Sequence, residues 1–167
     1  LIAYSIEIAL SSKCFDRVVV STEDEEIAGI AREYGAEVHN RSASLSGDNN
    51  TVAEVCVDFL KSQKEFGINW DQMVVLYATS PLRNLDDIKG VINVLESGDC
   101  DLAMGVTEYS HYVHQALSYD SNNHAKPVFP DWISKGHSEI PMMHVSNGSI
   151  YATWCDYFSV AKSFYPE

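Results

Sequence analysis

The fold class of this chain is decided by one stretch of sequence, Met73-Val74-Val75-Leu76-Tyr77-Ala78-Thr79-Ser80-Pro81-Leu82-Arg83. Its first four residues form an apolar run typical of a buried strand, and the Thr-Ser-Pro sequence after Ala78 predicts a tight turn. Such a turn places small hydroxyl groups and free backbone N–H groups at the carboxyl edge of a sheet. Ligands of open α/β sheets bind at that edge, so we expect a binding site around Thr79.

Helical and strand patterns alternate on both sides of this stretch. Apolar residues at helical spacing predict five helices. Their ranges are 2–12, from the capping residues 21–24 through Tyr34, from 51 to Gly67, from 85 to Gly98, and 155–163. Short apolar runs predict strands at 18–20, 36–39, 73–76, 102–107 and 149–153. This order predicts one α/β domain over 1–167, a three-layer sandwich with a mostly parallel sheet.

The helical rhythm disappears between residues 108 and 146. Ala116 to Tyr119, followed by Asp120 to Asn123, predicts a hairpin, and Asn147-Gly148 predicts a turn. The segment is too long to be a plain connection in a compact domain. Its apolar and aromatic residues around Trp132 and Met142 predict either a lid or an arm that forms a dimer.

Composition excludes several classes of function. The formal net charge of −13 argues against a nucleic acid or an anionic membrane as partner, and it makes a triphosphate an awkward ligand without local basic residues. No apolar run is long enough to span a bilayer. The four cysteines are dispersed and form no C-x-x-C pair, so we expect buried, reduced thiols and a cytoplasmic location.

Three further segments accompany the turn at 79–83, namely 11–22, Arg41 to Asp48 (RSASLSGD) and Asn147 to Tyr151 (NGSIY). In this order they resemble the CMP-nonulosonic acid synthetases, the family of acylneuraminate and pseudaminic acid cytidylyltransferases. Tyr77 and Ala78 stand where that family usually has Gln-Pro. The resemblance covers nearly the whole chain, and it implies the Rossmann-like fold of the nucleotide-diphospho-sugar transferases.

The resemblance also implies an activity. Family members transfer CMP from CTP to an acidic nine-carbon sugar (sialic, pseudaminic or legionaminic acid), release pyrophosphate and use Mg²⁺. The residues around 77–79 and 112–117 look more like the pseudaminic acid branch. A homodimer and a bacterial surface-glycan pathway are further implications of the resemblance.

Eight residues acquire roles through the resemblance, while catalytic residues and metal ligands stay unassigned. The expected contacts are, for the nucleotide, Arg41, Asp48 and Thr79, and, for the sugar, Tyr77, Ser80, Arg83, Asn147 and Tyr151. Structural alternatives remain open: Arg41 as a solvated loop residue, Asp48 as a helix cap, Arg83 as a surface charge and Tyr151 as a core residue. We expect the loops around 41, 79 and 151 to meet at one crevice.

Two family features are missing from the sequence. Family members begin with a strand and a basic loop that holds the triphosphate, and they carry an acidic D-x-D metal pair beyond the last helix predicted here. We therefore expect this chain to be a fragment or a shortened member that binds CTP poorly by itself. The alternative function is a binding or interaction module that keeps the fold without catalysis.

Overall fold

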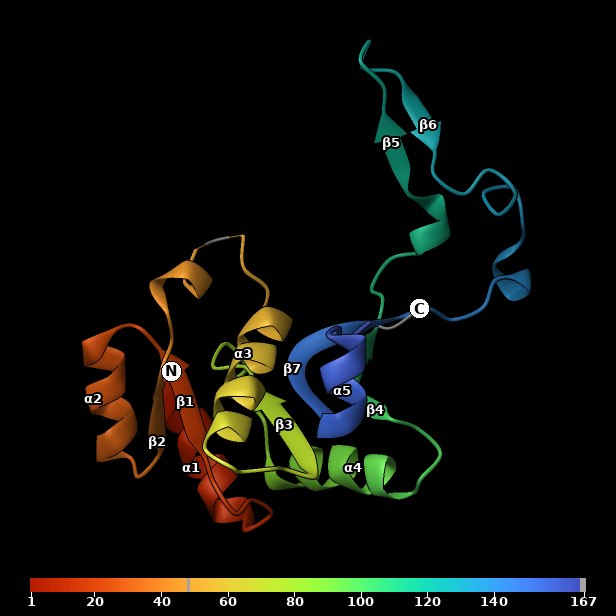
Figure 1. Cartoon of the computed structure of the whole chain (residues 1–167). Helices are drawn as coiled ribbons and strands as arrows, with labels where there is room; N and C mark the ends of the chain where they lie inside the picture. Colours follow the sequence, from red (N-terminus) through yellow and green to blue (C-terminus); the bar gives the residue numbers. More distant parts are fainter. Residues whose placement is uncertain (48, 166–167) are drawn as a thin grey trace. The chain divides into compact units, whose positions relative to one another are not determined.

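The computed structural model describes residues 1–47 and 49–165 (Figure 1). Helices and strands alternate from α1 to β4, as the sequence predicts, and three further strands precede α5. In chain order they are α1 (Ile2–Ser12), β1 (Val19–Thr22), α2 (Glu25–Glu33), β2 (Glu37–Asn40), α3 (Val52–Glu65), β3 (Gln72–Leu76), α4 (Leu85–Glu96), β4 (Leu102–Glu108), β5 (Leu117–Tyr119), β6 (Ala125–Pro127), β7 (His144–Trp154) and α5 (Cys155–Ala161).

The chain divides into two compact units, and each is described by itself. The first contains Leu1–Gly105 together with the chain from Gly148 onward, and the second is Val106–Asn147. The second unit holds β5 and β6, which pair antiparallel with Leu117 opposite Pro127. The predicted hairpin is therefore confirmed. The role of segment 108–146 as an arm or lid stays a prediction.

The first unit has strands between two layers of helices. β1 pairs in parallel with β2, and β3, β7 and β4 form a second sheet in that order. α1 contacts α2 and α4, whereas α3 contacts α5, so the helices form two separate sets. Side chains of β3 alternate between these sets, because Val75 packs in the cluster of α3 and α5 and Val74 packs against α4. This arrangement is the predicted three-layer sandwich.

Within residues 1–47 and 49–165, the core consists of three apolar clusters, and they follow the two sheets. One cluster joins α1 and α2 to β1 and includes Ile6, Val20 and Ala31. The other two cover opposite faces of the sheet that contains β3: Leu95 belongs to the cluster on the α4 face, and Phe158 to the cluster on the face of α3 and α5. The apolar clusters thus follow the two sheets, while α1 also contacts α4 of the other half.

The strand β7 corrects one prediction. Asn147-Gly148 was expected to form a turn, but β7 continues through both residues. Gly148 has a φ of 63°, which only glycine adopts easily, so it bends the strand without ending it. β7 runs antiparallel to β3, with Tyr151 opposite Val75.

Small residues, and not the large apolar ones, mark the buried faces of two helices. Ile27 and Val52 fit the apolar stripes of α2 and α3, yet each is 38% exposed, while their neighbours Ala28 and Ala53 are buried. An alanine brings the helix backbone closer to the strands than a branched side chain allows.

The described helices include none long and apolar enough to cross a membrane.

The cysteines are free thiols, but their burial varies. Cys56 and Cys155 are buried, as predicted. Cys14 is exposed and Cys100 is half-buried, so the prediction is wrong for Cys14. Cys14 lies just beyond the end of α1, where its apolar neighbours in sequence do not cover it.

Candidate functional site

A cavity of about 910 Å³ lies within the first unit, between α1, β1, α3 and β3. One end of it lies at the carboxyl ends of β1 and β3. Polar groups gather there, and the residues that line this end include Ser21, Arg41, Tyr77 and Thr79. The edge of the sheet where the sequence predicts a binding site is therefore hollow.

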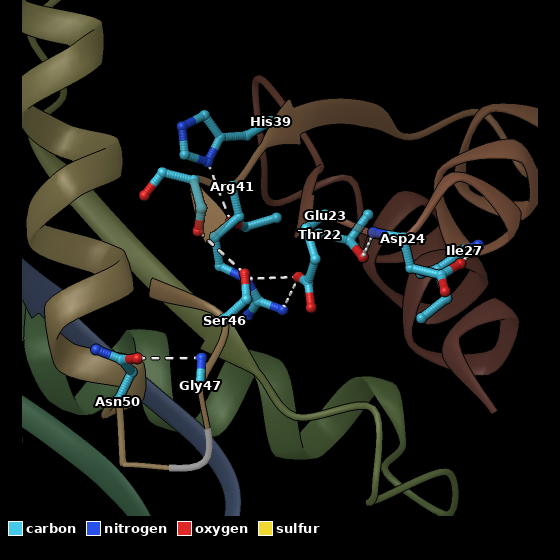
Figure 2. A network of polar contacts seen from close by, with 11 residues as sticks. Thr22, Glu23, Asp24, Ile27, His39, Arg41, Ser46, Gly47 and Asn50 are labelled. Carbon is cyan, nitrogen blue, oxygen red and sulfur yellow. Dashed lines mark hydrogen bonds and ion pairs between the residues drawn. The ribbon is translucent and has the colours of Figure 1, made fainter. Parts of the chain in front are cut away.

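Arg41 reaches this edge from the residue directly after β2. Its backbone N–H donates to the Thr22 carbonyl at 3.1 Å, which extends the pairing of β2 with β1. Its guanidinium forms an ion pair with Glu23 and donates through Nε to the same carboxylate at 2.9 Å (Figure 2). The pair fixes the guanidinium beside the cavity.

Glu23 completes a small polar network at this edge (Figure 2). The hydrogen bond from Arg41 lowers the pKa of the Glu23 carboxyl, with smaller contributions from its own backbone N–H and the Ser46 hydroxyl. Asp24 next to it accepts from the Ile27 N–H at 2.9 Å and caps α2. The loop between β1 and α2 is therefore fixed by two contacts, one from Glu23 to Arg41 and one from Asp24 to the first turn of α2.

The predicted turn after β3 is present. The Ser80 N–H donates to the Tyr77 carbonyl at 3.2 Å, and the Ser80 hydroxyl donates to the Gly148 carbonyl at 3.5 Å. Thr79 is exposed at the tip and lines the cavity. The turn therefore presents the Thr79 hydroxyl outward and directs Ser80 toward β7.

Arg83 lies inside the protein, with only 8% of its surface exposed. Its guanidinium donates to the Tyr77 carbonyl at 2.9 Å, to the Ser149 carbonyl and to the hydroxyls of Ser149 and Ser5 at 3.1 and 3.4 Å. Burial lowers the pKa of Arg83. These contacts join β3, β7 and α1, so the surface-charge alternative is wrong; contact with a sugar stays a prediction.

Tyr77 and Tyr151 belong to one aromatic group. Their ring centroids lie 5.5 Å apart, and Tyr151 also packs at 4.7 Å against Phe164. Tyr77 lines the cavity, and burial raises its pKa to about 12. Tyr151 is only 3% exposed and lies behind Tyr77 within a core cluster. The hydroxyl of Tyr151 lies 3.3 Å from that of Tyr165.

The structure thus brings together some of the residues predicted for the site. Arg41, Tyr77 and Thr79 line one cavity, while Tyr151 approaches it only through Tyr77. Asn147 belongs to the second unit, and Asp48 lies outside the described residues. The roles assigned to all eight residues stay predictions.

Sequence reasoning missed two contributors to the edge, Ser21 and Glu23. Ser21 lines the cavity, and its hydroxyl lies 3.1 Å from His39 Nδ1. The available signal was the Val18–Val20 run followed at once by Ser21, which is the same pattern that marked Thr79. The ion pair of Glu23 with Arg41 had no signal in the sequence, because 18 positions separate the two residues.

A metal centre needs several ligands close together. In the described part of the chain, no group of three or more histidine, cysteine, aspartate or glutamate side chains could hold a metal ion. His114 lies in a polar stretch of sequence, but it is 1% exposed and its Nε2 atom has no hydrogen-bond partner. It packs against Tyr112 within the second unit. The described residues therefore offer no metal site with three protein ligands.

Comparison with protein families gives a direct assignment. A family model described as Cytidylyltransferase matches residues 1–144. The chain belongs to this cytidylyltransferase family. The family resemblance inferred from the four motifs is confirmed.

Individual relatives agree with the assignment. Pseudaminic acid cytidylyltransferase of Campylobacter jejuni is 35% identical over 127 residues, which cover 74% of this chain and 53% of the relative. CMP-N,N'-diacetyllegionaminic acid synthase of Legionella pneumophila is 31% identical over 169 residues, covering 100% of this chain and 72% of the relative. The chain thus spans about half the length of the first curated relatives that it matches.

A solved structure supports the fold of this cytidylyltransferase family member. CMP:2-keto-3-deoxy-manno-octonic acid synthetase, in a complex with CTP, superimposes with a TM-score of 0.64 at 14% identity. The match covers 93% of this chain and 63% of that protein. The predicted nucleotidyltransferase type of α/β sandwich is therefore confirmed; at this identity the likeness concerns the fold alone.

Proposed function

We propose that this chain carries the catalytic fold of an enzyme that transfers CMP from CTP to an acidic nine-carbon sugar and releases pyrophosphate. The match of the cytidylyltransferase family model to residues 1–144 carries this proposal. The cavity at the carboxyl edge supports it, because Arg41 and Thr79 lie on its wall as the family resemblance requires. Pseudaminic acid is the sugar that we favour, on the relatives from Campylobacter jejuni.

The geometry indicates how the edge would serve such a reaction. Arg41 supplies a cation that Glu23 holds in place, and Thr79 supplies a hydroxyl on the wall of the same cavity. The sugar hydroxyl would attack the α-phosphorus of CTP while pyrophosphate leaves on the opposite side, so positioning and charge neutralisation provide most of the rate gain. Tyr77, with its raised pKa, stays neutral and presents an apolar ring to the cavity.

Magnesium is part of the proposal but not of the described site. The described residues offer no three-ligand cluster, so the phosphates of CTP would provide most of the ligands of the ion. We assign no protein residue to it and route no step through it.

A turnover assay on the full chain tests the proposal. CTP and Mg²⁺ are supplied with pseudaminic, legionaminic or sialic acid, and CMP-sugar and pyrophosphate are measured together. Formation of both products in equal amounts supports the enzyme. CTP binding in calorimetry without turnover supports the alternative, a binding module that keeps the fold. Absence of both binding and turnover contradicts each of them.

We also propose a homodimer formed through the second unit, and a cytoplasmic location. The second unit exposes several large apolar side chains, among them Leu117, Tyr119, Ile133 and Met142. Side chains of this kind are common in the centres of interfaces between subunits. Light scattering after size-exclusion chromatography tests the dimer, and deletion of residues 117–127 should leave a monomer if β5 and β6 carry the contact.

A further inference from the structure

The charged side chains on the cavity wall decide which ligands can enter it. Among the described residues, two arginines line the cavity, Arg17 at the amino end of β1 and Arg41 at the carboxyl edge. The other charged residues on the wall are acidic, namely Asp16, Asp71 and Glu96. An anion that enters the cavity therefore depends on the two guanidinium groups.

Arg17 has its three guanidinium nitrogens engaged. Nε donates to the Glu37 carboxylate at 2.7 Å, Nη2 forms an ion pair with the same carboxylate, and Nη1 donates to Gln63 Oε1 at 2.9 Å. The ring of Trp70 lies 5.5 Å from the guanidinium carbon. A further anion at Arg17 would have to break one of these contacts, so this end of the cavity does not attract one.

Arg41 keeps part of its guanidinium open. Its Nε and Nη2 atoms both donate to one carboxylate oxygen, Oε2 of Glu23. Within residues 1–47 and 49–165, Nη1 makes no contact, and the side chain is 25% exposed. Each guanidinium nitrogen carries N–H donors, so the Nη1 side of Arg41 can still bind a ligand.

Glu23 has contacts of its own besides Arg41. The Ser46 hydroxyl and the backbone N–H of Glu23 also act on its carboxylate, and together with Arg41 they lower its pKa (Figure 2). The carboxylate therefore stays ionised at neutral pH and stays beside Arg41. The two side chains carry opposite charges, so the pair has no net charge.

This pairing changes the electrostatics of the open Nη1 side. A phosphate that approaches Nη1 is attracted by the guanidinium, but the carboxylate that touches the guanidinium repels it at nearly the same range. The acidic residues on the wall and the net charge of −13 add to the repulsion. Hydrogen bonds from Nη1 remain available, but the charge that favours an oxyanion is offset.

We propose that Glu23 determines the specificity of this edge by excluding free oxyanions, such as inorganic phosphate and pyrophosphate, from Arg41. A ligand that carries phosphate then binds here only if the rest of it makes further contacts in the cavity. The exclusion itself does not depend on catalysis. Its benefit rests on the proposed function, because pyrophosphate is the product there, and a weakly bound product leaves and does not compete with CTP.

Calorimetric titration with inorganic pyrophosphate, at low salt and without metal ions, tests the exclusion. Glu23→Gln keeps an oxygen that accepts from Arg41 and removes the negative charge. We expect the variant to bind pyrophosphate about tenfold or more tighter than the parent protein. Equal or weaker binding overturns the proposal, and so does the absence of detectable binding to the variant at millimolar pyrophosphate.

Glu25→Gln is the matched control for net charge. It removes the same charge from the first turn of α2, where the Glu25 side chain is 84% exposed and does not line the cavity. We expect pyrophosphate binding to change by less than about twofold. Equal tightening in the Glu23 and Glu25 variants overturns the proposal, because net charge alone would then explain the gain.

A double variant locates the gain at Arg41. In an Arg41→Met background, Glu23→Gln should change pyrophosphate binding by less than about twofold, since the guanidinium that it releases is absent. A gain that persists without Arg41 overturns the proposal. Circular dichroism checks the fold of each variant. If Glu23→Gln does not fold, Glu23→Ser, which is also uncharged, takes its place with the same expected direction and the same overturning result.

The titrations contain neither CTP nor sugar, so they decide the role of Glu23 separately from the proposed function. Tighter pyrophosphate binding by Glu23→Gln in a chain that makes no CMP-sugar supports the exclusion and contradicts only the enzyme. Turnover in a chain whose Glu23→Gln variant binds pyrophosphate no tighter than the parent supports the enzyme and overturns the exclusion.

Discussion

Arg83 carries a guanidinium group inside the protein, where it donates to carbonyl oxygens of two neighbouring strands and to a hydroxyl on α1. Burial of a charge costs free energy, and these hydrogen bonds offset it. Arginine suits the position because its planar fork supplies several donors in fixed directions. The residue therefore ties the Thr79 turn to the sheet beneath it.

Replacement of Arg83 tests this role. Arg83→Met removes the guanidinium donor from the Tyr77 and Ser149 carbonyls and from the Ser149 and Ser5 hydroxyls, and we expect the free energy of unfolding to fall by about 3 kcal/mol. Arg32→Met is the control, since Arg32 is exposed and its ion pair with Glu25 is 3.9 Å long; its cost should stay under about 0.5 kcal/mol. Urea unfolding measures both. Equal costs for the two variants would refute the structural role.

The ion pair of Glu23 with Arg41 predicts a pH effect at the same edge. Arg41 lowers the pKa of Glu23 below its ordinary value of 4.5, so the pair stabilises the folded protein above that value. Its contribution is lost as the pH falls through the lowered pKa. Carbon-detected NMR titration of Glu23 should show the low pKa, and Arg41→Ala should return it toward 4.5. Glu54, whose pKa is lowered by Thr51, serves as the internal control and should not change.

At the scale of elements, helix ends follow local rules closely. Asp24, Thr51 and Asn84 cap the starts of α2, α3 and α4 through side-chain acceptors, and α3 and α4 have complete capping boxes. Gly35, just after α2, has a φ of 86°. These contacts lie within a few residues of one another, which explains why the sequence predicted the ends of these helices well.

Two glycines of this region should respond to alanine with opposite signs. Gly29 lies within α2 with open space around it, so Gly29→Ala should stabilise the protein by about 0.8 kcal/mol through helix propensity. Gly35→Ala should destabilise it by about 1 kcal/mol, because its positive φ strains an L side chain. Thermal unfolding of the two variants measures the difference. Shifts of the same sign would contradict the backbone assignment of Gly35.

At the scale of the whole molecule, the first unit consists of two sheets with their own apolar clusters, and the cavity lies between them. The candidate site therefore forms where the two halves meet at the carboxyl edge. Both halves contribute predicted residues, Arg41 from the end of β2, and Tyr77 and Thr79 from the segment after β3. Their proximity depends on the packing of both halves and on no local contact.

Cysteine reactivity reports on this packing. Burial raises the pKa of Cys56 to about 12 and that of Cys155 to about 11, so almost no thiolate forms at pH 8 in the folded protein. Cys14 is exposed. We expect iodoacetamide to label Cys14 in minutes and to leave Cys56 and Cys155 unlabelled, as mass spectrometry of peptides can show. In urea all four cysteines should react, and rapid native labelling of Cys56 would contradict the buried core.

Sequence patterns predicted the elements and the edge of the sheet, but they failed where burial depends on distant partners. Ile27 and Val52 fit an apolar stripe, yet Ala28 and Ala53 are the buried residues, because helix packing favours the small side chain at close approach. The Asn147-Gly148 pair has the composition of a turn, but β7 continues through it. His114 has a polar side chain, and only the fold of the second unit buries it.

The sequence by itself determined the alternation of helices and strands, the capped helix ends, the Thr79 turn and the membership of the cytidylyltransferase family. Periodicity and capping are local, so they can be read within a window of a few residues. Only the tertiary structure decided that Arg83 is buried, that Glu23 holds Arg41, and that β1 and β3 line one cavity. These features join residues far apart in the chain, and side-chain packing and strand pairing alone fix which of them meet.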